Sequence, residues 1–330
     1  MAATIDDVAK LAGCSITTVS RVYSVPDKVR PATRERILHA AEVLQYSPNA
    51  IARAMARQKN NSIAFVVDEK HYPIMQNPFY SEIAEAVQQE AESRGYNVYI
   101  TSTGASSQAS DLFMRKRMDG VVLAGQADQA LLARLHTQGM PIVLVNNRID
   151  LTDVPSITSN DYSGTVLAIE HLIDKGHKRI GLLAGNLFRY VSASRKQAYT
   201  DTMIRNGLTI DERYVCSVEA TQEAARLCTE QLLDLTDPPT ALFCMNDRIA
   251  IGAMKAALRR GLRVPDDLAV VGYDGSSICT VIEPELTTVC VNTEAMGRQS
   301  AKMLIKLIEG KTPKEMQIVL QPRLIVRGST

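Results

Sequence analysis

The sequence predicts a small all-helical N-terminal domain followed by a larger α/β region with two doubly wound parallel sheets. Three observations predict this architecture. The 330 residues suit two or three domains. Residues 1–46 contain three short amphipathic stretches, and from residue 62 short apolar runs alternate with helical patterns. The composition, 45% hydrophobic and 22% charged, is typical of globular proteins and excludes a disordered or fibrous chain.

Charge is divided unevenly along the chain. Residues 1–60 hold nine lysines and arginines against five acids, whereas the other 270 residues carry a net charge of −3. A basic N-terminal part on an acidic body indicates a polyanion-binding module. No apolar run approaches the roughly 18 residues that span a membrane. The N-terminus also lacks the order of a secretory signal, so we expect a cytoplasmic protein with no membrane partner.

The first two helices are predicted from their capping residues. Thr4 and Asp7 form the pattern of a capping box, with Asp in place of the usual Glu or Gln. Gly13 supplies a tight turn, and Ser15 can cap a second helix over residues 15–23. Apolar positions suited to packing between the two helices are Ile5, Val8, Ala9, Ala12, Val19 and Val22. Helix, glycine turn and helix together form the helix-turn-helix pattern.

A third helix is predicted over residues 31–45, because Pro31 is favoured in a first helical turn. We expect its inward face to consist of Ile37, Leu38, Ala41 and Leu44.

Four ordered motifs in this part, residues 4–13, 15–21, 33–37 and 46–53, closely resemble the lac repressor family. The last nine residues, 322–330, are also typical of that family, so the resemblance covers the whole chain. It implies a DNA-binding domain over residues 1–46, with the second helix in the major groove. The expected base-reading residues are Ile16, Thr17 and Arg21; Arg21 can bind guanine and Ile16 can contact a thymine methyl. The expected phosphate contacts are Ser15, Thr18, Arg30, Thr33 and Arg34.

Residues 47–61 are expected to form a linker with a hinge helix. Asn49 can cap a helix over residues 50–57, which is shorter than the roughly 12–15 residues that are marginal in water. The resemblance implies that two such helices pair across a dimer and fold in the minor groove of DNA. The expected hinge residues are Asn49, Ala52, Arg53, Met55 and Ala56. Met55 stands where the family usually has a wedging leucine; alternatively, it covers the core domain.

From residue 62 the chain predicts repeated β-α units. Candidate strands are residues 63–67, 98–100, 121–123, 142–145, 180–183, 241–244 and 268–272. Candidate helices are residues 80–94, 162–175, 193–206, 222–234 and 248–260. The resemblance implies a periplasmic-binding-protein-like core, in which three crossovers join two subdomains on either side of a ligand cleft. The expected subdomains are residues 62–159 with 290–320, and residues 160–289 with 321–330. Asn160-Asp161 stands where the family commonly has Asp-Asn, and Ala198 replaces a common glycine.

Six residues are expected to bind a small-molecule effector. Matching the family motif places Arg195 in the site, and Asn246 and Asp274 follow apolar strands whose carboxyl ends form crevices. The full set is Phe79, Tyr80, Arg189, Arg195, Asn246 and Asp274. Arginine donors, carboxylate acceptors and an aromatic face suit a polyhydroxylated ring. Alternatively, Arg195 and Asp274 form a structural ion pair.

A sugar or sugar derivative is therefore the favoured effector, and Arg189 beside Arg195 leaves room for an acidic or phosphorylated one. The alternative is a nucleobase, but Ala220 stands where purine-responsive relatives have a second aromatic residue. No nucleotide-binding or nucleophile motif is present, so we expect neither an enzyme nor a cofactor. A transport-type sugar-binding protein is the other rival, and it would normally carry a secretion signal.

Metal binding is not expected, because the five histidines show no ligand spacing and the six cysteines form no Cys-x-x-Cys pair. We expect all six cysteines to be reduced. The chain ends at Thr330 without trailing leucine heptads, which predicts a homodimer and a two-fold symmetric DNA operator.

Overall fold

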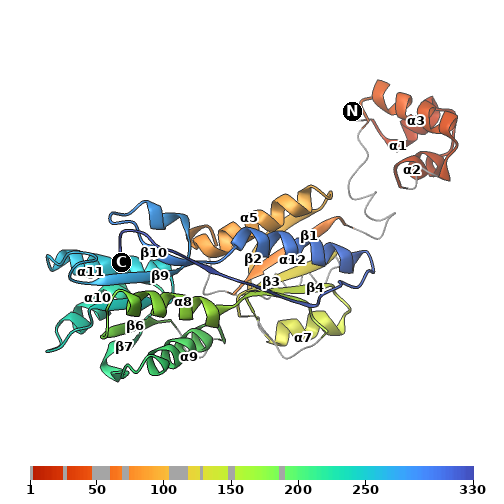
Figure 1. The fold of residues 1–330 in the computed structure, drawn as a ribbon. Helices are drawn as coiled ribbons and strands as arrows, with labels where there is room; N and C mark the ends of the chain where they lie inside the picture. Colours follow the sequence, from red (N-terminus) through yellow and green to blue (C-terminus); the bar gives the residue numbers. More distant parts are fainter. Residues whose placement is uncertain are drawn as a thin grey trace.

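The computed structural model describes residues 3–24, 28–46, 60–68, 74–103, 118–126, 129–147, 153–185 and 190–330. Within these residues, three helices form an N-terminal domain, and the described residues from 62 onward form two sheets with helices on their faces (Figure 1). The predicted fold class is confirmed.

The N-terminal domain consists of α1 (Ile5–Leu11), α2 (Ile16–Ser24) and α3 (Pro31–Val43). The predicted capping box is present. The Asp7 N–H donates to Thr4 Oγ1 at 3.3 Å, and the Thr4 N–H donates to Asp7 Oδ2 at 2.9 Å. Gly13 adopts a φ of +59° in the turn between α1 and α2, a region that glycine enters without steric cost.

The buried core of this domain is Val8, Ala9, Ala12, Val19, Val22, Ile37, Ala40 and Ala41. One detail of α3 differs from the prediction, since Leu38 is 40% exposed. Ile37, Ala40 and Ala41 are spaced i, i+3 and i+4, which places them on one face of a helix. Leu38 lies about 100° away from Ile37 around the axis, and Ala40 fills the inward position.

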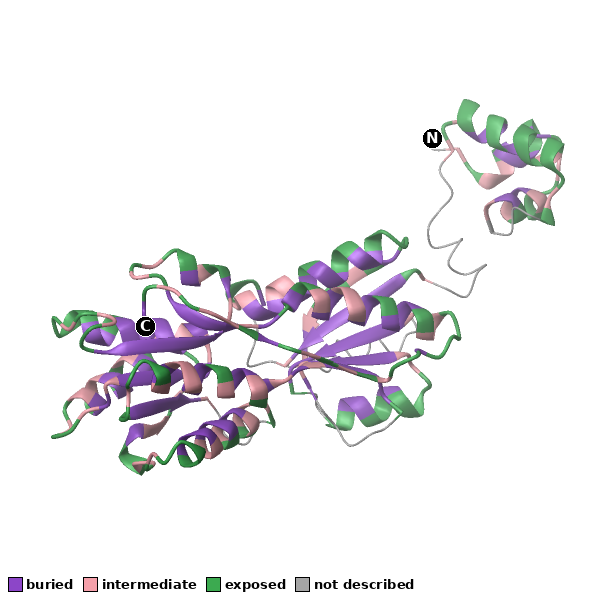
Figure 2. Ribbon diagram, in the orientation of Figure 1, coloured by how far each residue is buried: buried purple, intermediate pink, exposed green. Residues whose placement is uncertain are grey.

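The first sheet has the strand order β11-β5-β4-β3-β1-β2, and its strand pairs are parallel. Its strands are β1 (Ser62–Val67), β2 (Asn97–Ser102), β3 (Gly120–Ala124), β4 (Ile142–Val145), β5 (Ser156–Ser159) and β11 (Gln317–Leu320). Both faces of its central strands are apolar, as expected for a parallel sheet covered on both sides. Figure 2 shows these strands in the buried colour. Alternate residues of β1 belong to different cores, with Phe65 beneath α5 and α12 and Val66 beneath α7.

The second sheet has the strand order β12-β10-β9-β8-β6-β7. Its strands are β6 (Ile180–Ala184), β7 (Val215–Ser217), β8 (Ala241–Cys244), β9 (Ala269–Asp274), β10 (Thr287–Cys290) and β12 (Arg323–Ile325). Its pairs are parallel except for β10 with β12, which is antiparallel. Among the described residues, the helices on the first sheet are α5 (Pro78–Glu92), α7 (Gln129–Thr137) and α12 (Thr293–Ile308). Those on the second are α8 (Asp161–Asp174), α9 (Tyr190–Arg205), α10 (Gln222–Leu233) and α11 (Asp247–Arg259).

The described chain passes between the two sheets three times: after β5, after β10, and between β11 and β12. Short 3-10 helices complete the fold at η3 (Ile74–Gln76), η5 (Glu212–Tyr214) and η6 (Ser277–Thr280). One hydrophobic core runs across both sheets, because it contains residues of α5 and α12 together with residues of α8 and α9.

The cysteines require a correction. Cys216 in β7 and Cys228 in α10 form a disulfide, with their Cα atoms 6.9 Å apart, so the prediction of six reduced cysteines was wrong for this pair. The physical reason is that α10 follows the edge strand β7 and packs beside it. Cys14, Cys244, Cys279 and Cys290 are free. In the described residues no helix is long and apolar enough to cross a membrane.

Candidate functional sites

The first candidate site is the exposed surface of α2. Ile16 is 47% exposed, and Thr17 and Arg21 are also exposed, one helical turn apart. The hydroxyls of Ser15 and Thr18 lie 2.8 Å apart, and the Thr18 N–H donates to Ser15 Oγ at 3.2 Å, so Ser15 caps the helix as predicted. The three expected base-reading side chains are therefore free of the domain's own core.

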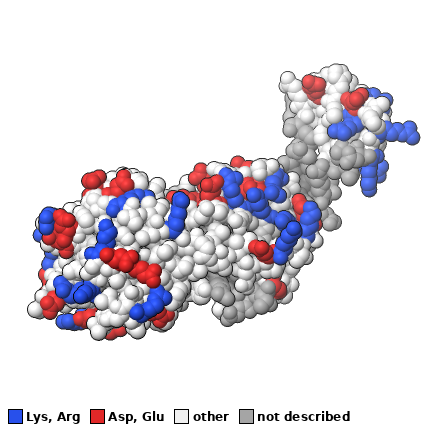
Figure 3. Space-filling view, in the orientation of Figure 1, with Lys and Arg blue, Asp and Glu red and all other residues white. Residues whose placement is uncertain are grey.

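The second part of this surface is the start of α3. Arg30 precedes the helix and makes no side-chain hydrogen bond to it, while Arg34 is exposed and Thr33 half-buried. Within the described residues neither arginine has an ion-pair partner. Figure 3 shows lysine and arginine side chains projecting from this domain. Basic side chains beside a helix N-terminus, whose backbone N–H groups are unpaired, can bind phosphate.

The second candidate site lies at the carboxyl ends of strands, and we call it the carboxyl-end cluster. It consists of Asp161, Arg195, Met245, Tyr273 and Asp274. Asp161 follows β5 as the first residue of α8, Met245 follows β8, and Asp274 is the last residue of β9. Arg195 comes from α9. Crevices outside the carboxyl ends of parallel strands are the usual ligand sites of such sheets.

Arg195 is the centre of the cluster and is only 5% exposed. Its Nε and Nη2 atoms donate to Asp161 Oδ1 at 2.9 and 2.7 Å, and its Nη1 donates to the Met245 carbonyl. The guanidinium carbon lies 3.5 Å from the centre of the Tyr273 ring, a cation–π contact. Burial acts to lower the pKa of Arg195, but Asp161, Tyr273 and Asp274 together outweigh it, so the net pKa is raised.

Asp274 differs from Asp161 in that its carboxylate accepts no hydrogen bond within the described residues. Arg195 Nη1 lies 3.9 Å from Asp274 Oδ1, beyond hydrogen-bond distance. Among the described residues no side chain or N–H donates to this carboxylate. Its φ of +112° is uncommon for a residue with a side chain, and such strain is often found at functional sites. Burial raises the pKa of Asp274 well above its ordinary value, against the attraction of Arg195.

Arg195 and Asp274 form a long ion pair, with Nη1 and Oδ1 3.9 Å apart. The partner that binds Arg195 tightly is Asp161, and Asp274 lies at the limit of ion-pair distance. The sequence prediction missed three residues of this cluster, namely Met245, Tyr273 and Asp161. The available signal for Asp161 was the order Asn160-Asp161, because Asn160 takes the capping position of α8 and accepts from the Ser163 N–H at 3.1 Å.

Asn246 also has a structural role, as it caps α11 by accepting from the Ile249 N–H at 2.8 Å. Its neighbour Asp247, only 1% exposed, accepts from the Ser276 N–H and hydroxyl at 2.8 Å and from the Thr288 hydroxyl at 2.6 Å. Asp247 therefore ties the start of α11 to the residues after β9 and to β10.

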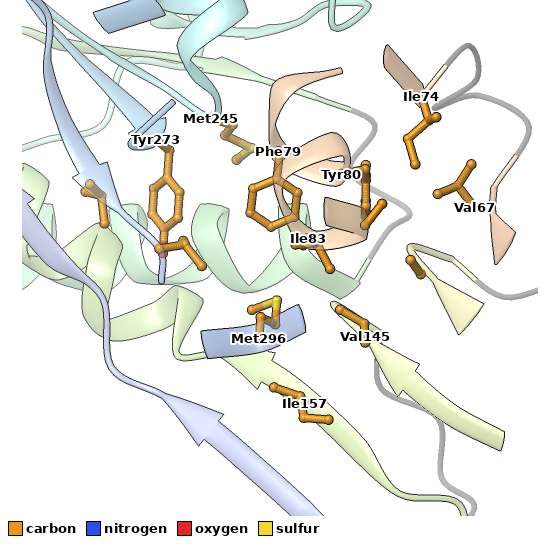
Figure 4. Packing of buried hydrophobic residues seen from close by; sticks show 14 of the residues in the cluster. Val67, Ile74, Phe79, Tyr80, Ile83, Val145, Ile157, Met245, Tyr273 and Met296 are labelled. Carbon is orange, nitrogen blue, oxygen red and sulfur yellow. The ribbon is translucent and has the colours of Figure 1, made fainter. Parts of the chain in front are cut away.

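The two predicted aromatic residues, Phe79 and Tyr80, are packed into the core. Their ring centres are 5.1 Å apart in an edge-to-face arrangement, and they are 7% and 4% exposed. Figure 4 shows the Phe79 ring between Tyr273 of the second sheet and Tyr80, in the same hydrophobic core. The Tyr80 hydroxyl accepts from Asn146 Nδ2 at 3.1 Å. Phe79 and Tyr80 of α5 thus share one hydrophobic core with Tyr273 of the carboxyl-end cluster.

The remaining predicted site residues lie outside the described part of the chain. They are Arg189 and the hinge residues Asn49, Ala52, Arg53, Met55 and Ala56. No group of three or more histidine, cysteine or acidic side chains suited to a metal ion occurs in the part that the structure describes.

A helix-turn-helix domain followed by a two-sheet core defines a class of proteins, the DNA-binding regulators with a ligand-binding core. Residues 4–49 match the family described as bacterial regulatory proteins, lacI family, and residues 169–330 match a periplasmic binding protein-like domain. The HTH-type transcriptional repressor CytR of Escherichia coli (strain K12) is 33% identical, covering 100% of this chain and 96% of CytR. The probable HTH-type transcriptional repressor ExuR of Bacillus subtilis (strain 168) is 33% identical, covering 99% and 98%.

Solved structures give the same result. The transcriptional regulator CelR–cellobiose complex matches with a TM-score of 0.77 and 31% identity, over 99% of this chain and 100% of that one. The lac repressor dimer bound to operator and the anti-inducer ONPF matches with a TM-score of 0.86 and 27% identity, over 100% and 99%. The chain therefore belongs to the lacI family and is a DNA-binding transcriptional regulator with an effector-binding core.

Proposed function

We propose that this regulator is a repressor that binds a two-fold symmetric operator as a homodimer and responds to a sugar or sugar derivative. Residues 1–46 bind DNA, residues 47–61 form the hinge, and residues 62–330 bind the effector and dimerise. Ile16, Thr17 and Arg21 read bases; Ser15, Thr18, Arg30, Thr33 and Arg34 contact phosphates. The dimer and operator are supported by the lac repressor structure, which contains both. The protein acts in the cytoplasm, needs no cofactor and catalyses no reaction.

The observation that carries the effector site is the carboxylate of Asp274, to which no group among the described residues donates a hydrogen bond. A buried or partly buried carboxylate without a donor is costly, and a ligand with several hydroxyl groups removes that cost by donating to it. Asn246 adds a side-chain amide group, and the relative solved with cellobiose is a precedent for a sugar in this fold. The favoured effector class is accordingly a sugar rather than a nucleobase.

Effector binding reaches DNA through a difference in affinity between two arrangements of the core. A ligand that prefers one arrangement of the two sheets shifts the hinge segments between DNA-bound and free forms. Phe79 and Tyr80, which share a hydrophobic core with Tyr273 of the second sheet, move with the first sheet in this mechanism.

The test combines binding selection, gel shifts and titration calorimetry on the full-length chain. We expect specific retardation of a palindromic DNA and a change in retardation with at least one neutral mono- or disaccharide. Asp274→Ala should abolish the saccharide response and leave operator affinity without saccharide nearly unchanged. An unchanged saccharide affinity in Asp274→Ala would contradict the site, and a response to nucleosides alone would contradict the sugar class.

A further inference from the structure

The pairing of Asp161 with Arg195 bears on which effectors the carboxyl-end cluster accepts. A guanidinium group has five N–H donors. Nε and Nη2 each donate to Asp161, and Nη1 donates to the Met245 carbonyl. The Tyr273 ring covers one face of the group. Arg195 therefore keeps few donors for a ligand, and Asp161 cancels its positive charge at a distance of 2.7 Å.

The local sequence explains why a carboxylate stands at this point. Asn160 occupies the capping position of α8 and satisfies the Ser163 N–H through its amide oxygen. The carboxylate at the next position is consequently free to face Arg195, and a negative charge in the first turn of a helix is favourable. An amide at position 161 would also reach Arg195, but it would leave the guanidinium charge uncancelled.

Further carboxyl groups surround the pair. Burial raises the pKa of Asp274 most, and the charges of Asp247, Asp161 and Glu82 raise it further; Arg195 is the cation that opposes them. Glu82, on α5 of the first sheet, accepts from the Thr293 hydroxyl at 2.9 Å. With Asp274 protonated, the Asp161–Arg195 pair has no net charge; with Asp274 ionised, the cluster is negative. Among the groups that the structure describes here, neither state has the net positive charge that attracts an anion.

We propose that Asp161 is a specificity-determining residue, which cancels the charge of Arg195 and so restricts the effector to uncharged or positively charged molecules. Sugar acids and sugar phosphates are excluded. This inference rests on the proposed function, since it names the charge class that the same site accepts. Specificity of this kind has two sources. The accepted ligand makes favourable contacts, and a rejected ligand places its charge beside a protein group of the same charge.

The test uses inorganic phosphate as the probe, at constant ionic strength maintained with sodium chloride, on full-length protein without DNA. By calorimetry, the wild type should show no saturable phosphate binding that the substitution Arg195→Gln removes. Asp161→Asn should bind phosphate at least about tenfold more tightly than the wild type, because one buried charge next to the guanidinium has been removed. The double variant Asp161→Asn/Arg195→Gln should lose that binding, which assigns it to the cluster rather than to the basic N-terminal domain.

The matched control is Glu170→Gln, which frees Arg205 from an exposed ion pair of 2.9 Å and should create no phosphate site. Circular dichroism establishes that each variant is folded, and Asp161→Ser is the second variant if Asp161→Asn is not. Phosphate binding to the wild type that Arg195→Gln removes overturns the proposal. So does a folded Asp161 variant that gains no phosphate affinity.

These outcomes are separable from those of the proposed function. Phosphate binding to Arg195 in the wild type overturns the proposed role of Asp161, whether or not saccharides bind. Absence of any saccharide response, with the phosphate results as expected, contradicts the sugar assignment and leaves the role of Asp161 in place.

Discussion

At the scale of single residues, the ionised carboxylate of Asp274 is less favourable in the folded protein than in water. Burial disfavours its ionised form and raises its pKa, and Arg195, 3.9 Å away, compensates only in part because its nearer partner is Asp161. The positive φ of Asp274 adds backbone strain. Residues that are unfavourable for stability and lie at strand ends are commonly retained for ligand binding.

The first prediction follows from the raised pKa of Asp274. An acid whose pKa is higher in the folded than in the unfolded state destabilises the folded protein once the pH exceeds the unfolded-state pKa, which is about 3.9 for aspartate. A tenfold difference in proton affinity between the two states corresponds to about 1.4 kcal/mol. Asp274→Asn should therefore raise the free energy of unfolding at pH 7. The gain should shrink as the pH falls toward 4. Urea unfolding at pH 7, 5.5 and 4 measures it.

Asp267 provides the control of opposite sign. Hydrogen bonds from Arg263 lower the pKa of Asp267 to about 2. Its ionised form therefore favours folding above pH 4, and that contribution is lost as the pH falls toward 2. Asp267→Asn should lower stability at pH 7. If Asp274→Asn also proves less stable than the wild type at pH 7, the destabilising role assigned to Asp274 is wrong.

The second prediction separates base reading from phosphate binding. Arg21→Ala should cost about 1–3 kcal/mol in operator binding and relax the preference at one base position in each half-site. Arg34→Ala should weaken binding to all sequences similarly and reduce the salt dependence. Binding-selection profiles and salt titrations measure the two effects. Identical base preferences for the wild type and Arg21→Ala would exclude the reading role of Arg21.

At the scale of elements, each parallel strand places the next helix and thus a polar side chain at its carboxyl end. Residues after β5 and β8 and at the end of β9 supply Asp161, Asn246 and Asp274 in this way. Asn246 serves two purposes, since its amide oxygen caps α11 and its amide nitrogen donates no hydrogen bond within the described residues. A side chain that stabilises a helix therefore also stands at the candidate effector site.

The third prediction tests these two roles separately. Asn246→Ala should lower the free energy of unfolding by about 0.5–2 kcal/mol, because the α11 cap is lost. Asn246→Asp should keep the cap and much of the stability while losing the amide donor, and with it effector affinity. Thermal unfolding and saccharide titration distinguish the roles. Thr221→Ala, which removes the α10 cap accepting from the Ala224 N–H at 3.2 Å, is the control that should affect stability alone.

At the scale of the whole molecule, the core is continuous across two sheets that the chain joins three times. Movement of one sheet relative to the other must therefore involve packed side chains such as Phe79 and Tyr273 (Figure 4). Packed cores of this kind favour discrete arrangements over gradual deformation, which suits a ligand-controlled switch.

The fourth prediction concerns assembly. A two-fold symmetric operator requires two N-terminal domains related by the same symmetry, so we expect a homodimer at micromolar concentration. Small-angle scattering should give twice the monomer mass of 36.2 kDa. A monomeric or tetrameric mass under these conditions would contradict it.

The sequence by itself predicted most of the helices, the central strands and the class of protein; α7 and α12 were not among the expected helices. Caps such as Thr4 with Asp7, and apolar periodicity in the strands, act over a few residues and can be recognised locally. The lac repressor resemblance directed attention to Arg195, Asn246 and Asp274, which the structure places near the ends of adjacent strands. Site roles for these residues remain proposals.

Only the tertiary structure decided which side chains pair. Asp161 and Arg195 are 34 positions apart and belong to different helices, so their contact depends on how α8 and α9 pack together. The disulfide of Cys216 with Cys228 and the burial of Phe79 against the second sheet have the same origin. Short-range patterns specify elements, whereas sheet order and packing bring distant residues together, and the charge of the candidate effector site depends on that packing.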